Sequence, residues 1–244
     1  MIETPQIEIK RASQRLETDT YWLESRHCFS FGGAFEPENQ NHGLLLVSND
    51  DIVKPGFGFE THPHRDMEIV TWVLDGELEH TDTVGNHDVI YAGLAQRMSA
   101  GRGIWHSEMN PSKEKSARFV QMWVMPDTES VDPSYEQLEV TTELSSGDLF
   151  PIASGRDDHA AIRIQQKGAV LWGGRLEGGK RINVPDAPYV HIYVAQRQVA
   201  LEGVGLLDEG DAVRLTHAGN PTLTAGAEGA EVLIWELAEP GIAG

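Results

Sequence analysis

The stretch Gly56-Phe-Gly-Phe-Glu-Thr-His62-Pro-His64 and the later stretch Gly101-Arg-Gly103-Ile-Trp-His106-Ser-Glu108 together decide how this chain is interpreted. Each carries two metal-ligand side chains spaced by two residues, and on a β-strand such side chains point to the same face. Two strands lying side by side would aim three imidazoles and one carboxylate at one point, a complete ligand set for a divalent transition metal. The sequence therefore predicts a metal site formed by His62, His64, His106 and Glu108.

The residues around both pairs strengthen this prediction, because a lone His-x-His carries little weight in a chain with 10 histidines among 244 residues. Asp75-Gly76 is typical of a tight hairpin turn. Gly101 and Gly103 permit a turn that delivers the following strand inward. The remaining histidines near turns or in polar stretches are interpreted as solvated, namely His27, His42, His80, His87, His159 and His217.

Strand signals dominate the whole chain. Short apolar segments such as 68–74 and 118–125 are separated by turns rich in Gly, Asn and Asp, at a spacing of about ten residues. No long stretch shows the 3.6-residue period of an amphipathic helix. The fold class is therefore predicted to be all-β, a sandwich or barrel.

The sequence pattern of the first half recurs in the second half. The segment beginning Val73-Leu-Asp-Gly is echoed by the one beginning Val194-Ala-Gln-Arg, and such an echo indicates two copies of one β unit. We expect an N-terminal metal-binding barrel over 1–140, a linker over 141–154 and a degenerate C-terminal barrel over 155–244. The second copy retains only His191 at a comparable place, so it is interpreted as metal-free, with His191 an ordinary strand histidine.

Composition excludes several classes of function. Acidic residues outnumber basic ones 38 to 19, and the formal charge of −19 would repel nucleic-acid phosphates, so no direct nucleic-acid binding is expected. No apolar run reaches the roughly eighteen residues of a membrane span, and the first residues lack the apolar core of a secretory signal. These features predict a cytoplasmic protein without a membrane contact. The one cysteine, Cys28, allows no intrachain disulfide.

The two histidine-bearing motifs resemble the paired motifs of the cupins, and more narrowly those of the pirin family. The pirin-like residues are Thr-His62-Pro-His64-Arg-Asp-Met-Glu68-Ile-Val-Thr and Met-Ser-Ala-Gly-Arg-Gly-Ile-Trp-His106-Ser-Glu108. The resemblance implies two tandem cupin barrels of the jelly-roll type, a bicupin, with Glu108 as the fourth ligand. Most other cupins use the glutamate after the first pair, here Glu68. We expect Glu68 to face inward and to orient a ligand imidazole through a hydrogen bond.

The resemblance also implies an activity. It predicts a metal-dependent dioxygenase that cleaves flavonols of the quercetin type with O2, in which Glu108 accepts the proton of the flavonol hydroxyl as general base. One divalent metal per chain is expected. Fe(II) is favoured, although the ligand types equally suit Mn, Co, Ni, Cu or Zn. One alternative is a redox-sensitive regulatory protein that binds transcription factors or metabolic enzymes without catalysis. Another is a zinc-dependent sugar isomerase on the same fold.

Overall fold

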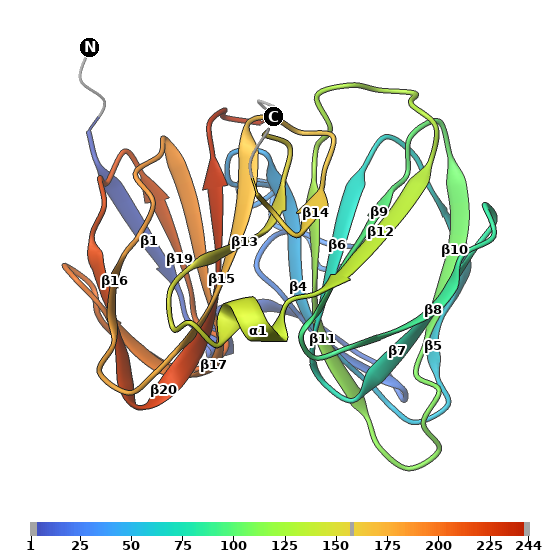
Figure 1. Ribbon diagram of the computed structural model, residues 1–244, viewed down its shortest axis with the longest axis horizontal. Helices are drawn as coiled ribbons and strands as arrows, with labels where there is room; N and C mark the ends of the chain where they lie inside the picture. Colours follow the sequence, from blue (N-terminus) through green and yellow to red (C-terminus); the bar gives the residue numbers. More distant parts are fainter. Residues whose placement is uncertain (1–3, 157–158, 242–244) are drawn as a thin grey trace.

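The computed structural model describes residues 4–156 and 159–241, which fold into two β-rich halves lying side by side (Figure 1). The N-terminal half comprises strands β2 to β12, and the C-terminal half comprises β1 together with β13 to β20. The one α-helix in the described residues, α1 (Thr141–Leu144), lies between the halves, and a short 3-10 turn, η1 (Ala12–Gln14), follows β1. The all-β fold class predicted from the sequence is confirmed.

The N-terminal half consists of a seven-stranded and a four-stranded sheet. The larger sheet runs, in order, through β12 (Ser134–Glu139), β9 (Leu94–Ser99), β6 (Glu68–Asp75), β11 (Ala117–Val124), β4 (Leu45–Val53), β3 (Leu23–His27) and β2 (Leu16–Asp19). The smaller sheet contains β5 (Gly58–His64), β10 (Ile104–Met109), β7 (Glu77–Asp82) and β8 (His87–Tyr91). The predicted hairpin at Asp75-Gly76 joins β6 to β7, with Gly76 at a φ of 76°.

The C-terminal half is built on a nine-stranded sheet. Its path is β1 (Gln6–Lys10), β19 (Ala212–Thr216), β17 (Tyr189–Leu201), β20 (Thr222–Leu237), β15 (Ala169–Leu176), β13 (Phe150–Ser154) and β14 (Ile162–Arg163). Two short strands, β16 (Arg181–Asn183) and β18 (Gly205–Leu207), pair with β20 and β17. The order β19-β17-β20-β15-β13 matches β9-β6-β11-β4-β3 strand for strand, as expected for two copies of one unit. The next strands differ, because β14 runs parallel to β13 whereas β2 runs antiparallel to β3.

The predicted division of the chain needs two corrections. Strand β1 pairs with β19 of the C-terminal sheet, although residues 1–140 were assigned to the first barrel. Strand β13 pairs with β15 and thus belongs to the C-terminal sheet, although it falls in the predicted linker 141–154. Both errors have one cause: apolar alternation identifies a strand but carries no information about a partner far away in the chain.

A shared apolar core joins the two halves along a surface that we call the seam. From the N-terminal half, Val70 and Trp72 of β6 enter this core, and they meet Tyr193, Leu233 and Trp235 of the C-terminal half. The Trp72 indole N–H also donates to Oε1 of Glu231 across the seam, at 2.7 Å. Each large apolar side chain buried here contributes about 1.5–3 kcal/mol. The seven-stranded sheet is consequently covered on its outer face by the second half of the protein.

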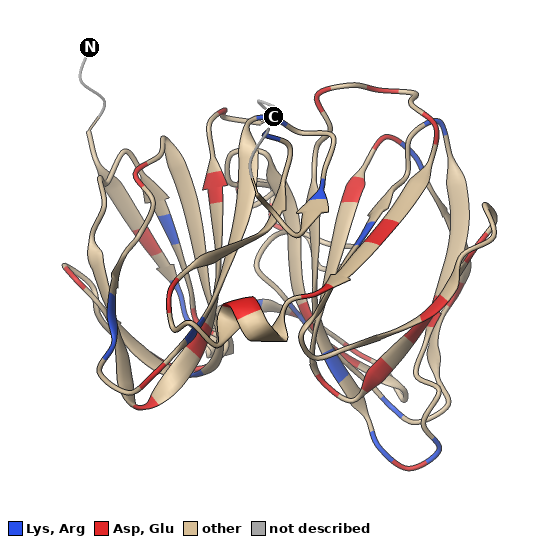
Figure 2. Cartoon of the chain, viewed as in Figure 1, with Lys and Arg blue, Asp and Glu red and all other residues tan. Residues whose placement is uncertain are grey.

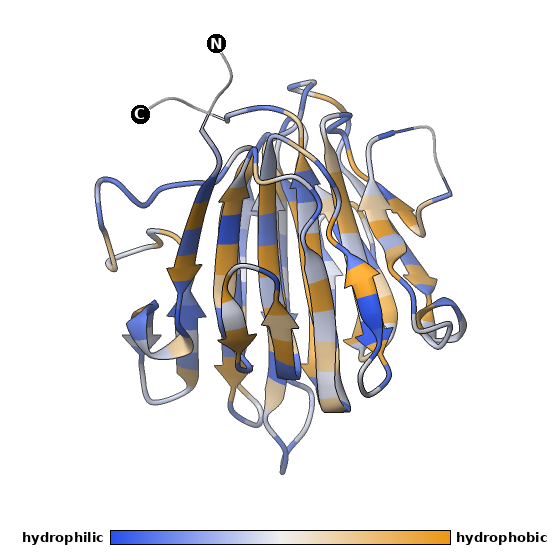
Figure 3. Cartoon of the chain, turned by 90° about the vertical axis from the view of Figure 1, so that its left-hand side faces the viewer, coloured by the Kyte–Doolittle hydropathy of each residue, from blue (hydrophilic) through white to orange (hydrophobic). Residues whose placement is uncertain are grey.

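The C-terminal half encloses a second core of its own, which is aliphatic. It is formed mainly by alternate residues of the long strands β17 and β20, among them Val190, Ile192, Val194, Val232 and Ile234. Figure 3, which faces this half, shows hydrophobic and hydrophilic residues alternating along its strands. That alternation is typical of strands with one buried face.

Acidic side chains are spread over both halves, and they outnumber the basic ones in each (Figure 2). No helix in the described part of the chain is long and apolar enough to cross a membrane.

Candidate metal centre

Three of the four predicted ligands come together on adjacent antiparallel strands. β5 pairs with β10 so that His62 lies opposite His106, and their ring centroids are 4.5 Å apart. The His64 ring lies 4.8 Å from His62 and 4.9 Å from His106. One ring nitrogen of each histidine lies within 4.8 Å of those of the other two. These three imidazoles therefore lie together, as their two-residue spacing and their place on neighbouring strands predict.

Irregularities in the two strands shape this cluster. A β-bulge shifts the register between His106 and Glu108, so that Glu60 and Thr61 of β5 oppose the single residue Ser107 of β10. The bulge brings the Glu60 carbonyl to 2.7 Å from Nδ1 of His62. A hydrogen bond donated by this Nδ1–H leaves the Nε2 lone pair free for a metal. Gly58 sits where β5 passes β10 so closely that a Cβ would lie 2.2 Å from the Glu108 carbonyl oxygen, which only glycine avoids.

His64 and His106 are in the charge state that metal binding requires. Burial, with the neighbouring imidazoles, lowers the pKa of His64 to about 4 and that of His106 to about 3, so both rings are neutral at pH 7. The Nε2 atoms of these two rings are buried and have no hydrogen-bond partner among residues 4–156 and 159–241. A buried polar atom without a partner is unfavourable, and a metal ion would satisfy both. The side chains present thus fit a metal ion.

Glu108, the fourth predicted ligand, is buried beside this cluster. Its Oε2 accepts a hydrogen bond of 2.6 Å from the Gln121 amide, and its Oε1 accepts one of 3.3 Å from the Thr71 hydroxyl. Gln121 is held in turn by the Trp123 indole N–H at 3.1 Å. A carboxylate oxygen of Glu108 lies within 4.8 Å of ring nitrogens of His80 and His106. The first group of possible ligands is His62, His64 and His106, and the second is His80, His106 and Glu108. Because both groups contain His106, they form one continuous site.

His80 is a member of this site that the sequence interpretation missed. It is fully buried, with Nδ1 3.5 Å from Nδ1 of His106 and Nε2 3.2 Å from Oδ2 of Asp82. Burial alone would raise the pKa of Asp82, but hydrogen bonds from Asn86 and His80, with backbone N–H groups of the following turn, outweigh it and lower that pKa. The carboxylate thus orients His80 against His106. The interpretation of His27, His42 and His80 as solvated is wrong, because all three are buried.

Glu68 is not brought to the cluster. Its Oε2 accepts hydrogen bonds from the Ser99 hydroxyl at 2.7 Å and from the Gln165 backbone N–H at 3.0 Å. Along β6, Thr71 faces Glu108, whereas Val70 enters the seam core. Glu68 shares the parity of Val70 and therefore points to the seam. The expectation that it faces inward is wrong, since Asp66 at a φ of 47° turns the chain between β5 and β6 and breaks the parity with His64.

A cavity of about 720 Å³ opens next to the histidines. His62, His64 and Gln121 line it, whereas His106 and Glu108 are not among its lining residues. Most of the remaining apolar wall is aromatic, formed by Tyr21, Trp22, Phe31, Phe57, Phe59 and Trp123. Trp123 packs edge-on against His64, with centroids 4.8 Å apart. The site is thus open to a ligand on the side of His62 and His64.

Comparison with known proteins agrees with the geometry. The family model described as Pirin matches residues 8–124. A Mycobacterium tuberculosis protein, named provisionally as a quercetin 2,3-dioxygenase, is 53% identical over 235 residues, which is 96% of each chain. This chain belongs to the pirin family.

A solved bacterial pirin shares the whole architecture. The crystal structure of the pirin YhhW from Escherichia coli in complex with nickel(II) superposes with a TM-score of 0.87 at 31% identity, covering 97% of this chain and all of the other. An Escherichia coli protein named quercetin 2,3-dioxygenase is 45% identical over 131 residues, 54% of this chain and 57% of the relative. The pirin identity and the histidine cluster agree with a site for one metal ion.

Proposed function

We propose that this pirin is a metal-dependent dioxygenase that cleaves flavonols of the quercetin type with O2. The observation that carries the proposal is the cavity of about 720 Å³, which gives a ligand access to His62 and His64 between aromatic walls. A volume of this size suits a small aromatic molecule, and flat aromatic side chains suit a planar ring system. The names of the relatives in Mycobacterium tuberculosis and Escherichia coli support the same substrate class.

The metal would be held by His62, His64, His106 and Glu108, and we propose Fe(II), with Mn, Co, Ni, Cu and Zn as ions that the same ligands accept. A divalent ion in this position polarises a bound enol hydroxyl, lowers its pKa and supports the reaction with O2. Three histidines and one carboxylate leave coordination positions for a ligand entering from the cavity.

Residues of the chain provide binding and proton transfer in this proposal. The aromatic walls exclude water and orient the ring system. Glu108 accepts the hydroxyl proton, for which its carboxylate must exchange one present partner for the substrate. Thr71 and Gln121 both donate hydrogen bonds to the Glu108 carboxylate. The same two donors keep the carboxylate in place before substrate arrives.

The activity is tested by loading the protein separately with each of the six ions and adding quercetin in air. Loss of flavonol absorbance, O2 uptake and release of carbon monoxide are measured together. We expect turnover with at least one ion, with equal amounts of O2 consumed and carbon monoxide released. The His64→Ala variant, which lacks a ligand, should show none.

Two results would count against the proposal. Quercetin that binds every metal form without O2 uptake would exclude the dioxygenase activity. Capture of a protein partner by a metal-loaded but inactive chain would favour the regulatory alternative.

A further inference from the structure

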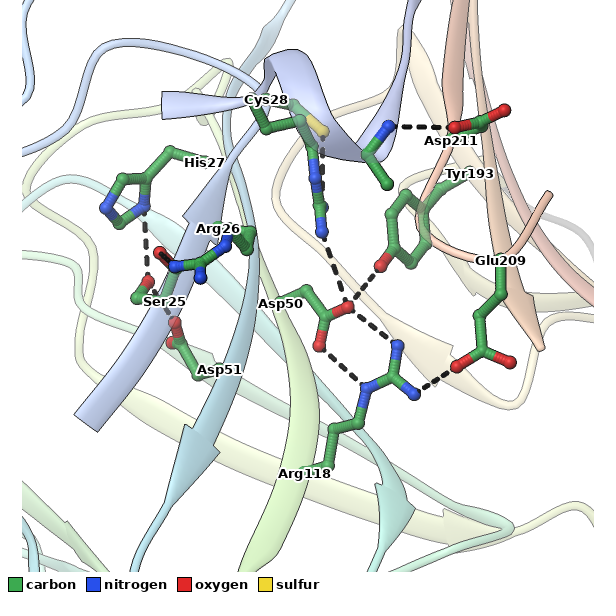
Figure 4. Close-up of polar contacts among 12 residues, drawn as sticks. Ser25, Arg26, His27, Cys28, Asp50, Asp51, Arg118, Tyr193, Glu209 and Asp211 are labelled. Atoms are coloured by element: carbon green, nitrogen blue, oxygen red, sulfur yellow. Dashed lines mark hydrogen bonds and ion pairs between the residues drawn. The ribbon is translucent and has the colours of Figure 1, made fainter. Parts of the chain in front are cut away.

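A second carboxyl group, Asp51, lines the cavity on the wall opposite the histidines. It lies on β4 of the seven-stranded sheet, whereas His62 and His64 lie on β5 of the four-stranded sheet, and all three residues line the same space. Neighbouring Asp50 points to the seam, where it meets Arg118 and Tyr193 (Figure 4). Two adjacent carboxyls thus serve opposite faces of one strand, and only Asp51 faces the cavity.

Asp51 is the inner end of a chain of hydrogen bonds along the cavity wall. Its Oδ1 accepts a short hydrogen bond from the Ser25 hydroxyl, which lies 3.3 Å from Nδ1 of His27 (Figure 4). Nε2 of His27 lies 2.9 Å from the Thr18 hydroxyl, and all four residues line the cavity. We call the four residues Thr18, Ser25, His27 and Asp51 the polar wall. It extends from the half-buried Thr18 to the buried Asp51.

The charges around Asp51 leave it without a strong counterion. Burial, reinforced by the negative charges of Asp50 and Glu108, raises the pKa of Asp51 to about 7 against the opposing hydrogen bond from Ser25 and the charge of Arg15. Asp51 makes no ion pair within residues 4–156 and 159–241. A carboxyl in this state donates a hydrogen bond when protonated and accepts one when ionised.

A neighbouring acceptor also faces the cavity. Asn49 shares the face of β4 with Asp51 and lines the same space. Its buried Oδ1 has no hydrogen bond of good geometry in the described residues, apart from a weak interaction with His27. Buried polar atoms normally find partners. A hydroxyl-bearing ligand would supply one.

We propose that Asp51, with Ser25, His27 and Asn49, binds a hydroxyl group of the substrate that is remote from the metal. The proposal rests on the proposed function, since it assumes a ligand whose chelating end reaches His62 and His64. The ligand then spans the cavity: its chelating group faces the four-stranded sheet and its hydroxylated ring faces β3 and β4. The substrate class narrows accordingly to flavonols with hydroxyls on the pendant ring, and Asp51 becomes a residue that determines specificity.

Binding to the Zn(II) form in the absence of O2 tests this proposal without turnover. The probes are quercetin and galangin, flavonols that differ only in the two hydroxyls of the pendant ring. We expect the wild-type protein to bind quercetin about 3–10-fold more tightly than galangin, the effect of one net hydrogen bond. In Asp51→Ala the quercetin affinity should fall to that of galangin, and galangin affinity should stay within a factor of about two.

Three further variants test whether the hydrogen bonds of Asp51 cause the preference for quercetin. Asp51→Asn, whose amide still forms hydrogen bonds, should keep most of the preference for quercetin. Ser25→Ala should reduce the preference partly, and it covers the case in which Asp51→Ala does not fold. Asp50→Asn is the matched control on the opposite face of β4, and it should leave the ratio of the two affinities unchanged even if it lowers thermal stability.

Several outcomes would overturn the proposal. These are a wild-type protein that does not distinguish the two flavonols, an Asp51→Ala variant that weakens both equally, and an Asp50→Asn variant that abolishes the preference. Failure of the proposed function has a different signature, because a protein that never turns over quercetin can still bind it more tightly than galangin through Asp51.

Discussion

The two halves of this pirin share the order of five strands in their large sheets, but their interiors hold different kinds of side chain. Inside its curved nine-stranded sheet the C-terminal half holds an aliphatic core of residues such as Ile192 and Ile234. The corresponding space in the N-terminal half holds histidines, carboxyls and a cavity of about 720 Å³. Burial of aliphatic side chains stabilises a fold, whereas buried polar groups and open space do not. Aliphatic packing thus fills the interior of one copy, whereas polar groups and open space occupy part of the interior of the other.

The seam explains how the second arrangement is tolerated. The outer face of the seven-stranded sheet, with Val70 and Trp72, packs against the C-terminal half. The N-terminal half therefore adds apolar burial against its neighbour to the two smaller apolar clusters of its own interior. The predictions below test this division of labour.

The largest difference between the halves should appear in metal binding. His64→Ala removes a proposed ligand, so metal affinity should fall by more than the roughly 100-fold that loss of an orienting group costs. His191→Ala in the C-terminal half should retain the metal. Elemental analysis of both proteins after dialysis measures this. Near two metals per wild-type chain, or metal loss in His191→Ala, would show that the C-terminal half binds metal as well.

The second prediction concerns Glu108. Glu108→Gln preserves the size and one acceptor oxygen but removes the proton acceptor, so turnover of quercetin should fall about 10²–10⁴-fold. Rates are to be compared at equal metal loading. Turnover within a few-fold of wild type would leave Glu108 as a ligand only.

The third prediction concerns the His80–Asp82 pair behind His106. His80→Ala and Asp82→Asn should each weaken metal affinity roughly 10–100-fold, the usual effect of losing a group that orients a ligand imidazole. Competition with a chromophoric chelator measures the affinity. His87→Ala is the matched control, because His87 is exposed and lies on the adjacent strand β8. Equal effects of His80→Ala and His87→Ala would contradict the orienting role.

The fourth prediction concerns the pH dependence of stability. The pKa of Asp51 is raised in the folded protein to about 7, so the folded state retains a proton that the unfolded chain has already released above about pH 4. Asp51 therefore costs stability as pH rises from about 4 to 7, with the full cost present above pH 7. Asp51→Asn cannot ionise and should be stabilised relative to wild type at pH 8, by roughly 1 kcal/mol or more, but hardly at pH 4.

Thermal denaturation of both metal-free proteins at the two pH values measures this difference. An advantage of Asp51→Asn that is the same at pH 4 and pH 8 would rule out ionisation as its origin.

The smallest effect is expected at Glu68. Because Glu68 contacts Ser99 and Gln165 at the seam, Glu68→Gln should leave metal affinity unchanged and lower stability by about 1 kcal/mol. Urea denaturation and chelator competition measure the two quantities. A tenfold weaker metal affinity would reinstate Glu68 as an orienting group for the ligands.

The clustering of the three histidines could be predicted because their geometry is local. His62 and His64 lie on one strand, and His106 and Glu108 on another, so a spacing of two residues fixes their common face. The pairing of the two strands followed from the shared chemistry of the four residues. The all-β class and the repeated unit were likewise readable from short-range patterns.

Glu68 and His80 could not be placed in this way. The strand that begins at Glu68 is buried on both faces, since Ile69, Val70 and Thr71 are all buried, and it therefore lacks the alternation that would reveal its orientation. His80 lies in the polar run Glu-Leu-Glu-His-Thr-Asp, which suggests solvent. Its burial depends partly on Tyr135 of β12, whose ring lies 4.9 Å from it. Contacts so remote in the chain leave no local pattern.

The pairing of β1 with β19 has a consequence for the synthesis of this protein. Ile9 leaves the ribosome long before its partner Val213, which lies about 200 residues further along the chain, is made. Closing so long a loop is entropically costly, and folds rich in such contacts form slowly. Until the C-terminal half exists, the seam face with Val70 and Trp72 has no cover and is open to aggregation. The nascent chain thus passes through its most vulnerable state before its last strands emerge.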